Sequence, residues 1–125
     1  MQFTYNKHEK LKSRKLIKLL FEKGEKISVF PLMLLYLEVE HESKYPVQAG
    51  VTVSKKNFKR AVDRNRIKRL LREVYRLNKP FLYEKIEKKY IFMFIYLGKE
   101  EIKLQLLDQK MKELLEQFQN KIAKK

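Results

Sequence analysis

The chain has 125 residues and carries 30 Lys and Arg residues against 15 Asp and Glu residues, a formal net charge of +15. A surplus of this size destabilises a compact protein by self-repulsion unless a polyanion is bound, and nucleic acid is the commonest polyanion. The absence of cysteine excludes disulfides, thiolate zinc sites and thiol catalysis. An anionic membrane is the rival partner, but a membrane-binding helix buries its apolar face in lipid, whereas the apolar face of the basic helix over residues 61–76 is needed by the sheet. No uncharged run approaches the roughly 20 residues that a spanning helix needs.

The first 24 residues predict a polar arm followed by a short helix. Residues 1–12 are polar and basic, so we expect a loose arm; they lack the apolar segment of a signal peptide, so we expect a cytoplasmic protein. Ser13 can cap a helix over residues 14–23, because its hydroxyl accepts hydrogen bonds from free backbone N–H groups. Gly24 is expected to end this helix in the left-handed conformation that glycine tolerates.

Two strand-like regions come next. Residues 27–39 are rich in β-branched, aromatic and aliphatic side chains, which is typical of strands. Pro31 cannot donate to a strand ladder, so it either splits this region or lies at a sheet edge. After a turn over residues 41–46, residues 47–54 alternate apolar and polar side chains, which predicts a half-buried strand.

The stretch "AVDRNRIKRLLREVYR", residues 61–76, predicts an amphipathic helix that Pro80 closes. Its apolar face consists of Ile67, Leu70, Leu71, Val74 and Tyr75. At about 100° per residue, the opposite arc is assigned to Arg64, Asn65, Lys68, Arg69, Arg72 and Arg76, with no carboxylates in the band to pair with them. Arginine presents a planar fork that matches phosphate oxygens, and asparagine can contact a 2′-hydroxyl or a base edge. Just upstream, residues 54–56 lie where a strand ends, a favourable place for phosphate contacts.

The last third of the chain predicts a strand and a helix. Residues 89–98 are apolar throughout, which indicates a central strand buried on both faces. Residues 100–120 predict a helix, and residues 120–125 a frayed tail. The buried face of this helix is expected to hold Leu107, Met111, Leu114, Leu115 and Phe118. Because the basic helix lies between two strands, we expect it to join a parallel pair within a single domain over residues 1–125.

Two interpretations of the basic helix remain at this point, a merely solvated face or a nucleic-acid surface. The net charge and the one-sided helix agree with each other and favour nucleic acid. His8 and His41 are the only histidines and have no convergent ligands nearby in the sequence, so we predict no metal site. There is no glycine-rich phosphate loop. We therefore predict no catalytic residue on the protein itself.

The segment "TVSKKNFKRAVDRNRIKRLLREVYR" resembles the signature of the bacterial ribonuclease P protein subunit. In that family a strand ending in S-K-K is followed by A-V-x-R-N-R-x-K-R. The matching positions here are Ser54, Lys55, Lys56, Ala61, Val62, Arg64, Asn65, Arg66, Lys68 and Arg69. An early match at Leu11, Lys12, Leu20, Phe21 and Gly24, the length and the charge extend the resemblance over nearly the whole chain. Where the family has Asn before A-V this chain has Arg60, with Asn57 as a candidate substitute cap.

The resemblance implies a fold and a function. The fold is α/β (α+β), a two-layer sandwich of about four strands with three helices, similar to a ribosomal-protein domain and with a left-handed βαβ crossover. The protein would bind a catalytic RNA, and the complex would remove the 5′ leader from precursor tRNA using Mg²⁺ held on the RNA. The implied RNA-binding residues are Ser54, Lys55, Lys56, Arg60, Arg64, Asn65, Arg66, Lys68, Arg69 and Arg72. A ribosomal or RNA-chaperone protein without a role in tRNA processing is the alternative.

The family also implies a cleft for the single-stranded leader between the first helix and the open face of the sheet. Phe21 matches one aromatic position of that cleft, whereas the other is Ile17, which has no π-face for stacking. Tyr36, on a strand expected to line the cleft, is our candidate replacement. The alternative is that Ile17 and Phe21 simply belong to the core, since Leu16 and Leu20 on the same helix also need burial.

Overall fold

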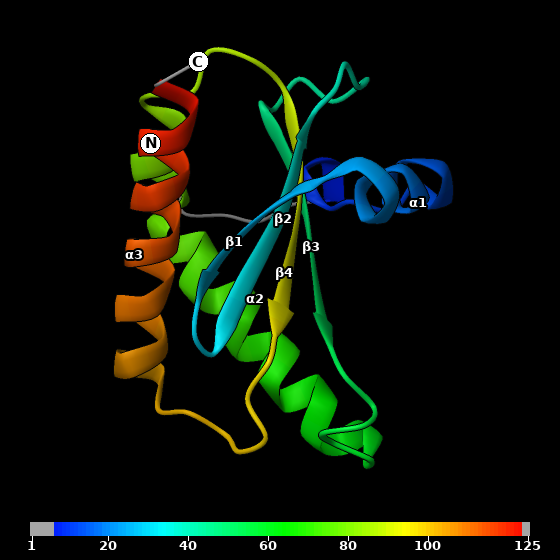
Figure 1. Ribbon diagram of the computed structural model, residues 1–125, viewed down its shortest axis with the longest axis vertical. Coiled ribbons are helices and arrows are strands. Elements are labelled where there is room, and N and C mark those ends of the chain that lie inside the picture. Colours follow the sequence, from blue (N-terminus) through cyan, green and yellow to red (C-terminus); the bar gives the residue numbers. More distant parts are fainter. Residues whose placement is uncertain (1–6, 124–125) are drawn as a thin grey trace.

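A four-stranded sheet runs through the middle of the molecule and carries helices on both of its faces (Figure 1). The computed structural model describes residues 7–123. The elements are the short 3-10 helix η1 (Lys7–Glu9), α1 (Arg14–Lys23), β1 (Glu25–Val29), β2 (Leu32–Glu38), β3 (Val47–Val53), α2 (Ala61–Tyr83), β4 (Tyr90–Tyr96) and α3 (Leu104–Ala123). The α+β fold with three helices and about four strands is therefore confirmed.

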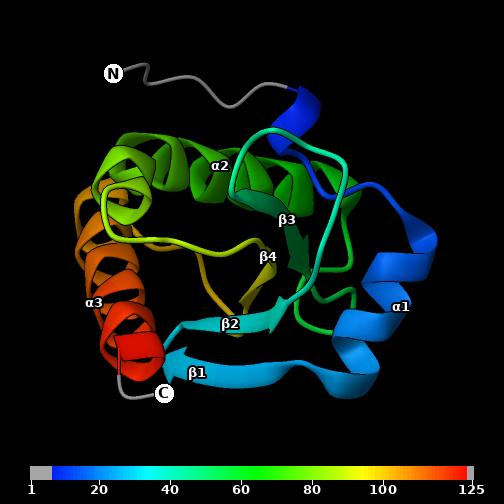
Figure 2. The ribbon, with the colours of Figure 1, turned by 90° about the horizontal axis from the view of Figure 1, so that it is seen from above.

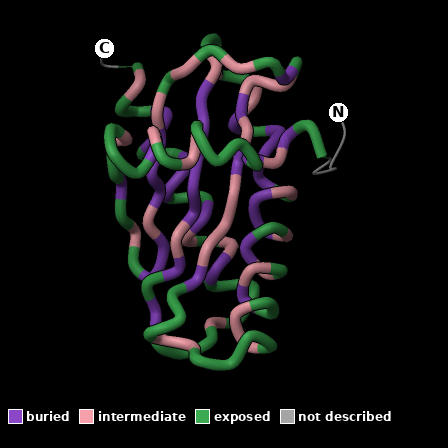
Figure 3. The backbone as a smooth tube through the Cα atoms, turned by 90° about the vertical axis from the view of Figure 1, so that its right-hand side faces the viewer, coloured by how far each residue is buried: buried purple, intermediate pink, exposed green. Residues whose placement is uncertain are grey.

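The strands lie in the order β1-β2-β4-β3. β1 and β2 form an antiparallel hairpin with Phe30 and Pro31 between them. Of the two alternatives for Pro31, the structure therefore confirms that it splits the first strand region. β2 pairs antiparallel with β4, and β3 pairs parallel with β4. The basic helix α2 therefore joins the parallel pair, as predicted, and β4 is a central strand. Figure 3 shows buried positions running along the strands, with exposed positions on the outer helix faces and in the loops.

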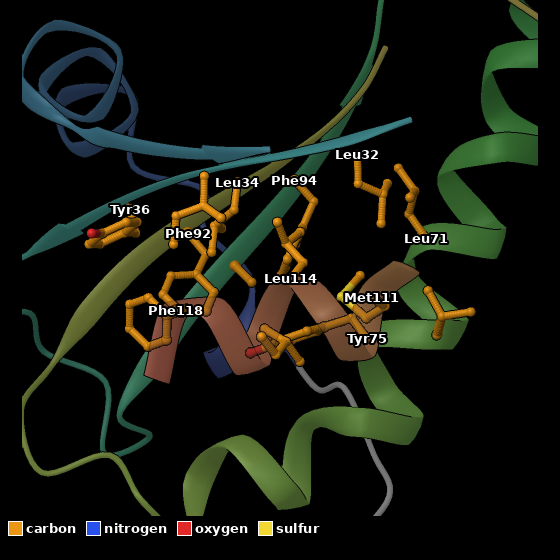
Figure 4. Close-up of a cluster of buried hydrophobic side chains, with 14 of the residues drawn as sticks. Leu32, Leu34, Tyr36, Leu71, Tyr75, Phe92, Phe94, Met111, Leu114 and Phe118 are labelled. Atoms are coloured by element: carbon orange, nitrogen blue, oxygen red, sulfur yellow. The ribbon is translucent and has the colours of Figure 1, made fainter. Parts of the chain in front are cut away.

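The main core lies between the sheet and the pair α2 and α3. Figure 4 shows Leu34, Phe92 and Phe94 of the sheet pointing toward Met111 and Phe118 of α3. The rings of Phe92 and Phe118 meet edge to face at 4.8 Å between centroids. Burying each such side chain stabilises the fold by about 1.5–3 kcal/mol relative to exposure, so this face dominates the packing energy.

The other face of the sheet carries α1, which adds a partial third layer to the two-layer sandwich we expected (Figure 2). Leu20 is fully buried there among Leu35, Ile91 and Met93. Ser13 caps α1 as predicted, since its hydroxyl accepts from the Leu16 amide at 3.2 Å. Gly24 ends the helix, but in extended rather than left-handed backbone. Glycine is needed for space instead, because a Cβ here would overlap the Leu20 carbonyl oxygen and come within 2.9 Å of Leu20 Cδ1.

The expectation of a loose arm is wrong for residues 7–12, which form what we call the N-terminal strap. Lys10 pairs with Ala49 beside β3, and the buried Leu11 donates its amide to the Ala49 carbonyl at 3.0 Å. The Glu9 side chain has 0% exposure and the Lys79 side chain of α2 has 4%, and Lys79 Nζ lies 2.6 Å from Glu9 Oε2. Tyr83 donates its hydroxyl to the same oxygen at 2.7 Å. The rest of the expected arm, residues 1–6, lies outside the described residues.

Two helix ends differ from prediction. Pro80 does not close α2, which continues to Tyr83. A proline inside a helix removes a hydrogen bond, but here Leu82 is fully buried and Gln119 of α3 donates to the Phe81 carbonyl at 3.3 Å, so tertiary contacts hold the last turn. The last helix begins at Leu104 rather than residue 100 and continues through residues 120–123, where a frayed tail was expected. Residues 124–125 lie outside the described residues.

The buried pair between Glu9 and Lys79 gives a stability prediction. Lys79→Met leaves the Glu9 carboxylate buried without its cation, so we expect a loss of about 3–5 kcal/mol in the free energy of unfolding, measured by urea denaturation. The matched control is Lys88→Met, which removes the exposed partner of Glu38 at 3.7 Å and should change stability by no more than about 0.5 kcal/mol. Equal small losses in both variants would show that the buried pair does not anchor the strap.

Candidate nucleic-acid interface

The packing of α2 determines which of its side chains reach solvent. Ile67, Leu71 and Val74 are buried against the sheet and α3. The opposite side of the helix is exposed at Asn65, Arg66, Arg69 and Arg72. The predicted one-sided basic helix is therefore present, with its cations turned away from the core.

Not all the cations of the basic region are available to a partner. Arg64 lies on the side of Ile67 and Leu71 rather than on the opposite arc, and it is partly buried. Its guanidinium donates to the carbonyls of Phe58 and Lys59, both at 2.8 Å. The expectation that Arg64 belongs to the free arc is therefore wrong, and the side chain instead ties the preceding loop to α2.

Carboxylates pair with two arginines of α2, and one of these, Arg76, belongs to the predicted band, where no carboxylate of the helix was expected to pair. Arg66 pairs with Glu101 of the β4–α3 loop at 3.0 Å. Arg76 pairs with Glu73 at 2.6 Å, and the hydrogen bond from Arg76 lowers the pKa of the Glu73 carboxyl. Within residues 7–123, six other cations of this region make no side-chain ion pair or hydrogen bond. They are Lys55, Lys56, Lys59, Lys68, Arg69 and Arg72.

The loop from Ser54 to Arg60 is held by its own side chains. Ser54 Oγ accepts from the Lys56 amide at 3.1 Å, which forms a tight turn at the end of β3. Asn57 does not cap α2 as we expected. Its side-chain amide lies 3.3 Å from the Leu97 carbonyl and donates to the β4–α3 loop. Arg60 occupies the N-cap position without a side-chain cap bond and approaches Asp63 at 4.0 Å.

The three residues assigned to the leader cleft separate in the structure. Ile17 is partly buried and packs against the cluster beneath α1. Phe21 is 53% exposed, so the alternative that it is simply core is wrong. Tyr36 is only 2% exposed and lies on the opposite face, edge to face with Phe118 at 5.0 Å, and burial raises its pKa to about 12. Its assignment to the cleft is therefore corrected, because alternate residues of β2 face opposite sides of the sheet.

Further exposed cations were missed by the sequence reasoning. Lys59 lies in the Ser54–Arg60 loop, and Arg14, Lys15 and Lys18 lie on the outer side of α1. The helical spacing of the last three could have shown them, since residues three and four apart share one side of a helix.

The comparison with known proteins decides the family. The family model described as Ribonuclease P matches residues 5–119. The chain belongs to the ribonuclease P protein family. It is 43% identical to the ribonuclease P protein component of Porphyromonas gingivalis over 94 residues, which cover 74% of this chain and 68% of that one. The corresponding protein of Dictyoglomus thermophilum is 40% identical over 85 residues, covering 68% of both chains.

Solved structures show the same fold. The ribonuclease P protein of Thermotoga maritima is similar with a TM-score of 0.69 and 24% identity, over 87% of this chain and 96% of that one. The Staphylococcus aureus protein gives a TM-score of 0.68 and 19% identity, over 86% and 93%. As a ribonuclease P protein component, the chain acts in tRNA processing with the ribonuclease P RNA as its partner. The alternative of a ribosomal or RNA-chaperone protein is therefore set aside.

Within residues 7–123 no helix has the length and apolar character to cross a bilayer. Over the same residues, no three His, Cys, Asp or Glu side chains gather in a way that could hold a metal ion.

The free cations of α2 give the second prediction. Changing Lys68, Arg69 and Arg72 together to Ala should weaken binding to the ribonuclease P RNA and lower the slope of log K against log salt by roughly two to three units, because each phosphate contact releases counterions. A filter-binding salt titration measures this. The control with the same loss of charge changes Lys85 and Lys88, just after the C-terminal end of α2, and Lys121, in the last turn of α3. All three are exposed, and this variant should alter the slope less. Equal slopes for both variants would mean that α2 is only a solvated face.

Proposed function

We propose that the outward side of α2 and the Ser54–Arg60 loop bind the ribonuclease P RNA through its phosphates. The observation that carries this proposal is the set of six unpaired cations on a helix and loop whose positions are set by buried contacts. Arg60 and Asn65, exposed in the same region, would add a further cation and an uncharged donor and acceptor. Arg64 would act indirectly, because its guanidinium holds the loop through the Phe58 and Lys59 carbonyls. Arg66 would either stay paired with Glu101 or exchange that carboxylate for an RNA phosphate.

We propose further that the space beside α1 receives the 5′ leader of precursor tRNA. α1 covers only part of its face of the sheet, and Gln48 and Thr52 of β3, on this same face, remain partly exposed. The exposed ring of Phe21 supplies a surface on which a single-stranded base can stack. Ile17 contributes apolar area at its side, and the cations Arg14, Lys15 and Lys18 attract the leader phosphates.

In this proposal the protein positions substrate and the RNA performs catalysis. Metal ions such as Mg²⁺, held by the RNA, would supply a nucleophilic water and neutralise charge on the scissile phosphate. The protein's cations would reduce the repulsion between the two RNAs, so that the leader is cut off and the mature tRNA 5′ end is formed. We place this reaction in the cytoplasm.

A reconstitution experiment tests the division of labour. Adding the protein to the ribonuclease P RNA and precursor tRNA at low Mg²⁺ should release the leader faster than the RNA alone, because the protein's charge replaces part of the screening by metal ions. Gel separation of the leader measures the rate. The purified, RNA-free protein should not cleave precursor tRNA at any Mg²⁺ concentration, and cleavage by such a preparation would overturn the assignment of catalysis to the RNA.

Phe21→Ala tests the leader site. It should weaken binding of leader-bearing precursor tRNA to the holoenzyme by about 1–3 kcal/mol, the typical contribution of a stacked base, and leave binding of mature tRNA nearly unchanged. Because Phe21 is exposed, the melting temperature of the free protein should stay close to that of the unchanged chain. Phe81→Ala, which removes a similarly exposed ring from α2, should leave both substrates unaffected. Equal losses for both tRNAs in Phe21→Ala would contradict a leader contact.

A further inference from the structure

Exposed apolar side chains gather at one end of the molecule, away from α1. The tip of the β1–β2 hairpin, the β4–α3 loop and the first turn of α3 lie in the lower part of Figure 1. Their side chains line a half-open cavity of about 600 Å³. Phe30 is 69% exposed at its rim, and Leu97 and Leu106 are also exposed there. We call the surface formed by Phe30, Leu97 and Leu106 the apolar platform.

The three apolar side chains of the platform are not required to close the core. The core beneath the platform is already closed by Tyr96, which is 1% exposed and donates its hydroxyl to the Glu100 carbonyl. Gly98 packs directly on that ring, since a Cβ at this position would lie 3.0 Å from it. Exposed apolar side chains gathered around a hollow mark an interaction site more often than isolated ones do.

The platform is physically continuous with the proposed RNA-binding surface. Asn57 of the Ser54–Arg60 loop donates to the carbonyls of Leu97 and Gly98 at 3.3 and 3.4 Å. Arg66 of α2 pairs with Glu101 of the same β4–α3 loop. An RNA that contacts α2 and its preceding loop therefore reaches the platform's border without leaving the protein surface.

The charges around the platform indicate the chemistry of its occupant. Lys99 and Lys110 line the cavity, and Glu100 is its one acidic lining residue. A second copy of this chain would bring a further charge of +15 to this lysine border and be repelled, whereas RNA brings phosphates. An apolar surface with an aromatic ring and flanking cations suits an unpaired nucleobase with its backbone.

We propose that the apolar platform binds an unpaired nucleobase of the ribonuclease P RNA. The base stacks on Phe30 and rests against Leu97 and Leu106, while Lys99 and Lys110 contact the adjoining phosphates. This inference deepens the proposed function and rests on it, because it assumes that the RNA lies along α2. It adds a second stacking site, separate from Phe21 and directed at the RNA subunit rather than at the leader.

Substitutions at Phe30 test the proposal with the full-length protein and the ribonuclease P RNA. Phe30→Ala should weaken the affinity about five- to a hundredfold, the range expected for one stacked base. Phe30→Tyr, which keeps the aromatic face, should bind within about twofold of the unchanged chain, and Phe30→Leu should lose most of what Ala loses. Because Phe30 is largely exposed, thermal melts should show all three variants folded. Phe81→Ala is the matched control and should not change RNA affinity.

Chemical probing of the RNA identifies the base. One unpaired nucleotide should be protected from a base-modifying reagent by the unchanged protein and become reactive with Phe30→Ala. Unchanged affinity and unchanged reactivity in Phe30→Ala would overturn the proposal, as would full binding by Phe30→Leu. Self-association of the unchanged protein that disappears in Phe30→Ala would also overturn it, in favour of a second copy. The Lys68, Arg69 and Arg72 variant, titrated in parallel, separates failure of the platform from failure of the α2 surface.

Discussion

The burial of one side of α2 against the sheet and α3 determines where the protein can place its charge. Ile67, Leu71 and Val74 are buried, and removing such side chains from the core would cost about 1.5–3 kcal/mol each. A rotation of the helix by one residue would also bring arginine into an apolar environment, at a much larger cost. The helix therefore has one orientation, and Arg69 and Arg72 face solvent because the core requires it.

The C-terminal end of α2 also helps to position α1 and, with it, the proposed leader site. Near its C-terminal end, Lys79 and Tyr83 bind the buried carboxylate of Glu9 and so hold the N-terminal strap against β3. Ser13 caps α1 only a short length of chain further on. Breaking a buried ion pair is expensive, so the start of α1 is tied to α2 across the sheet edge. The proposed RNA surface and the proposed leader site are therefore positioned by opposite ends of one helix.

The sequence predicted the elements well because hydrophobic periodicity is local, whereas partners distant in sequence were missed. Both faces of β2 are apolar, so its period of two was hidden and Tyr36 was placed on the wrong side. Glu9 and Lys79 look like ordinary surface charges, and nothing near either residue in the sequence indicates the other. Gly24 was correctly predicted to end α1, but the predicted left-handed conformation was wrong, because glycine is required there by lack of space rather than by backbone conformation. Tertiary contacts decide which cations form ion pairs within the protein, and these contacts cannot be predicted from composition.

The R-N-R motif, residues 64–66, contributes internal contacts as well as positive charge. Arg64 stands three and seven residues before Ile67 and Leu71, so it falls on the buried side and reaches back to the carbonyls of Phe58 and Lys59. Arg66 falls on another side and meets Glu101, while Asn57 donates to the same loop at Leu97. These contacts hold the loop that carries Lys55 and Lys56 before RNA is bound. A loop that is already ordered loses less conformational entropy on binding, so in the proposed function more of each phosphate contact would appear as affinity. The motif would then act in two ways, through arginines that shape the surface and through neighbouring cations that remain free for RNA.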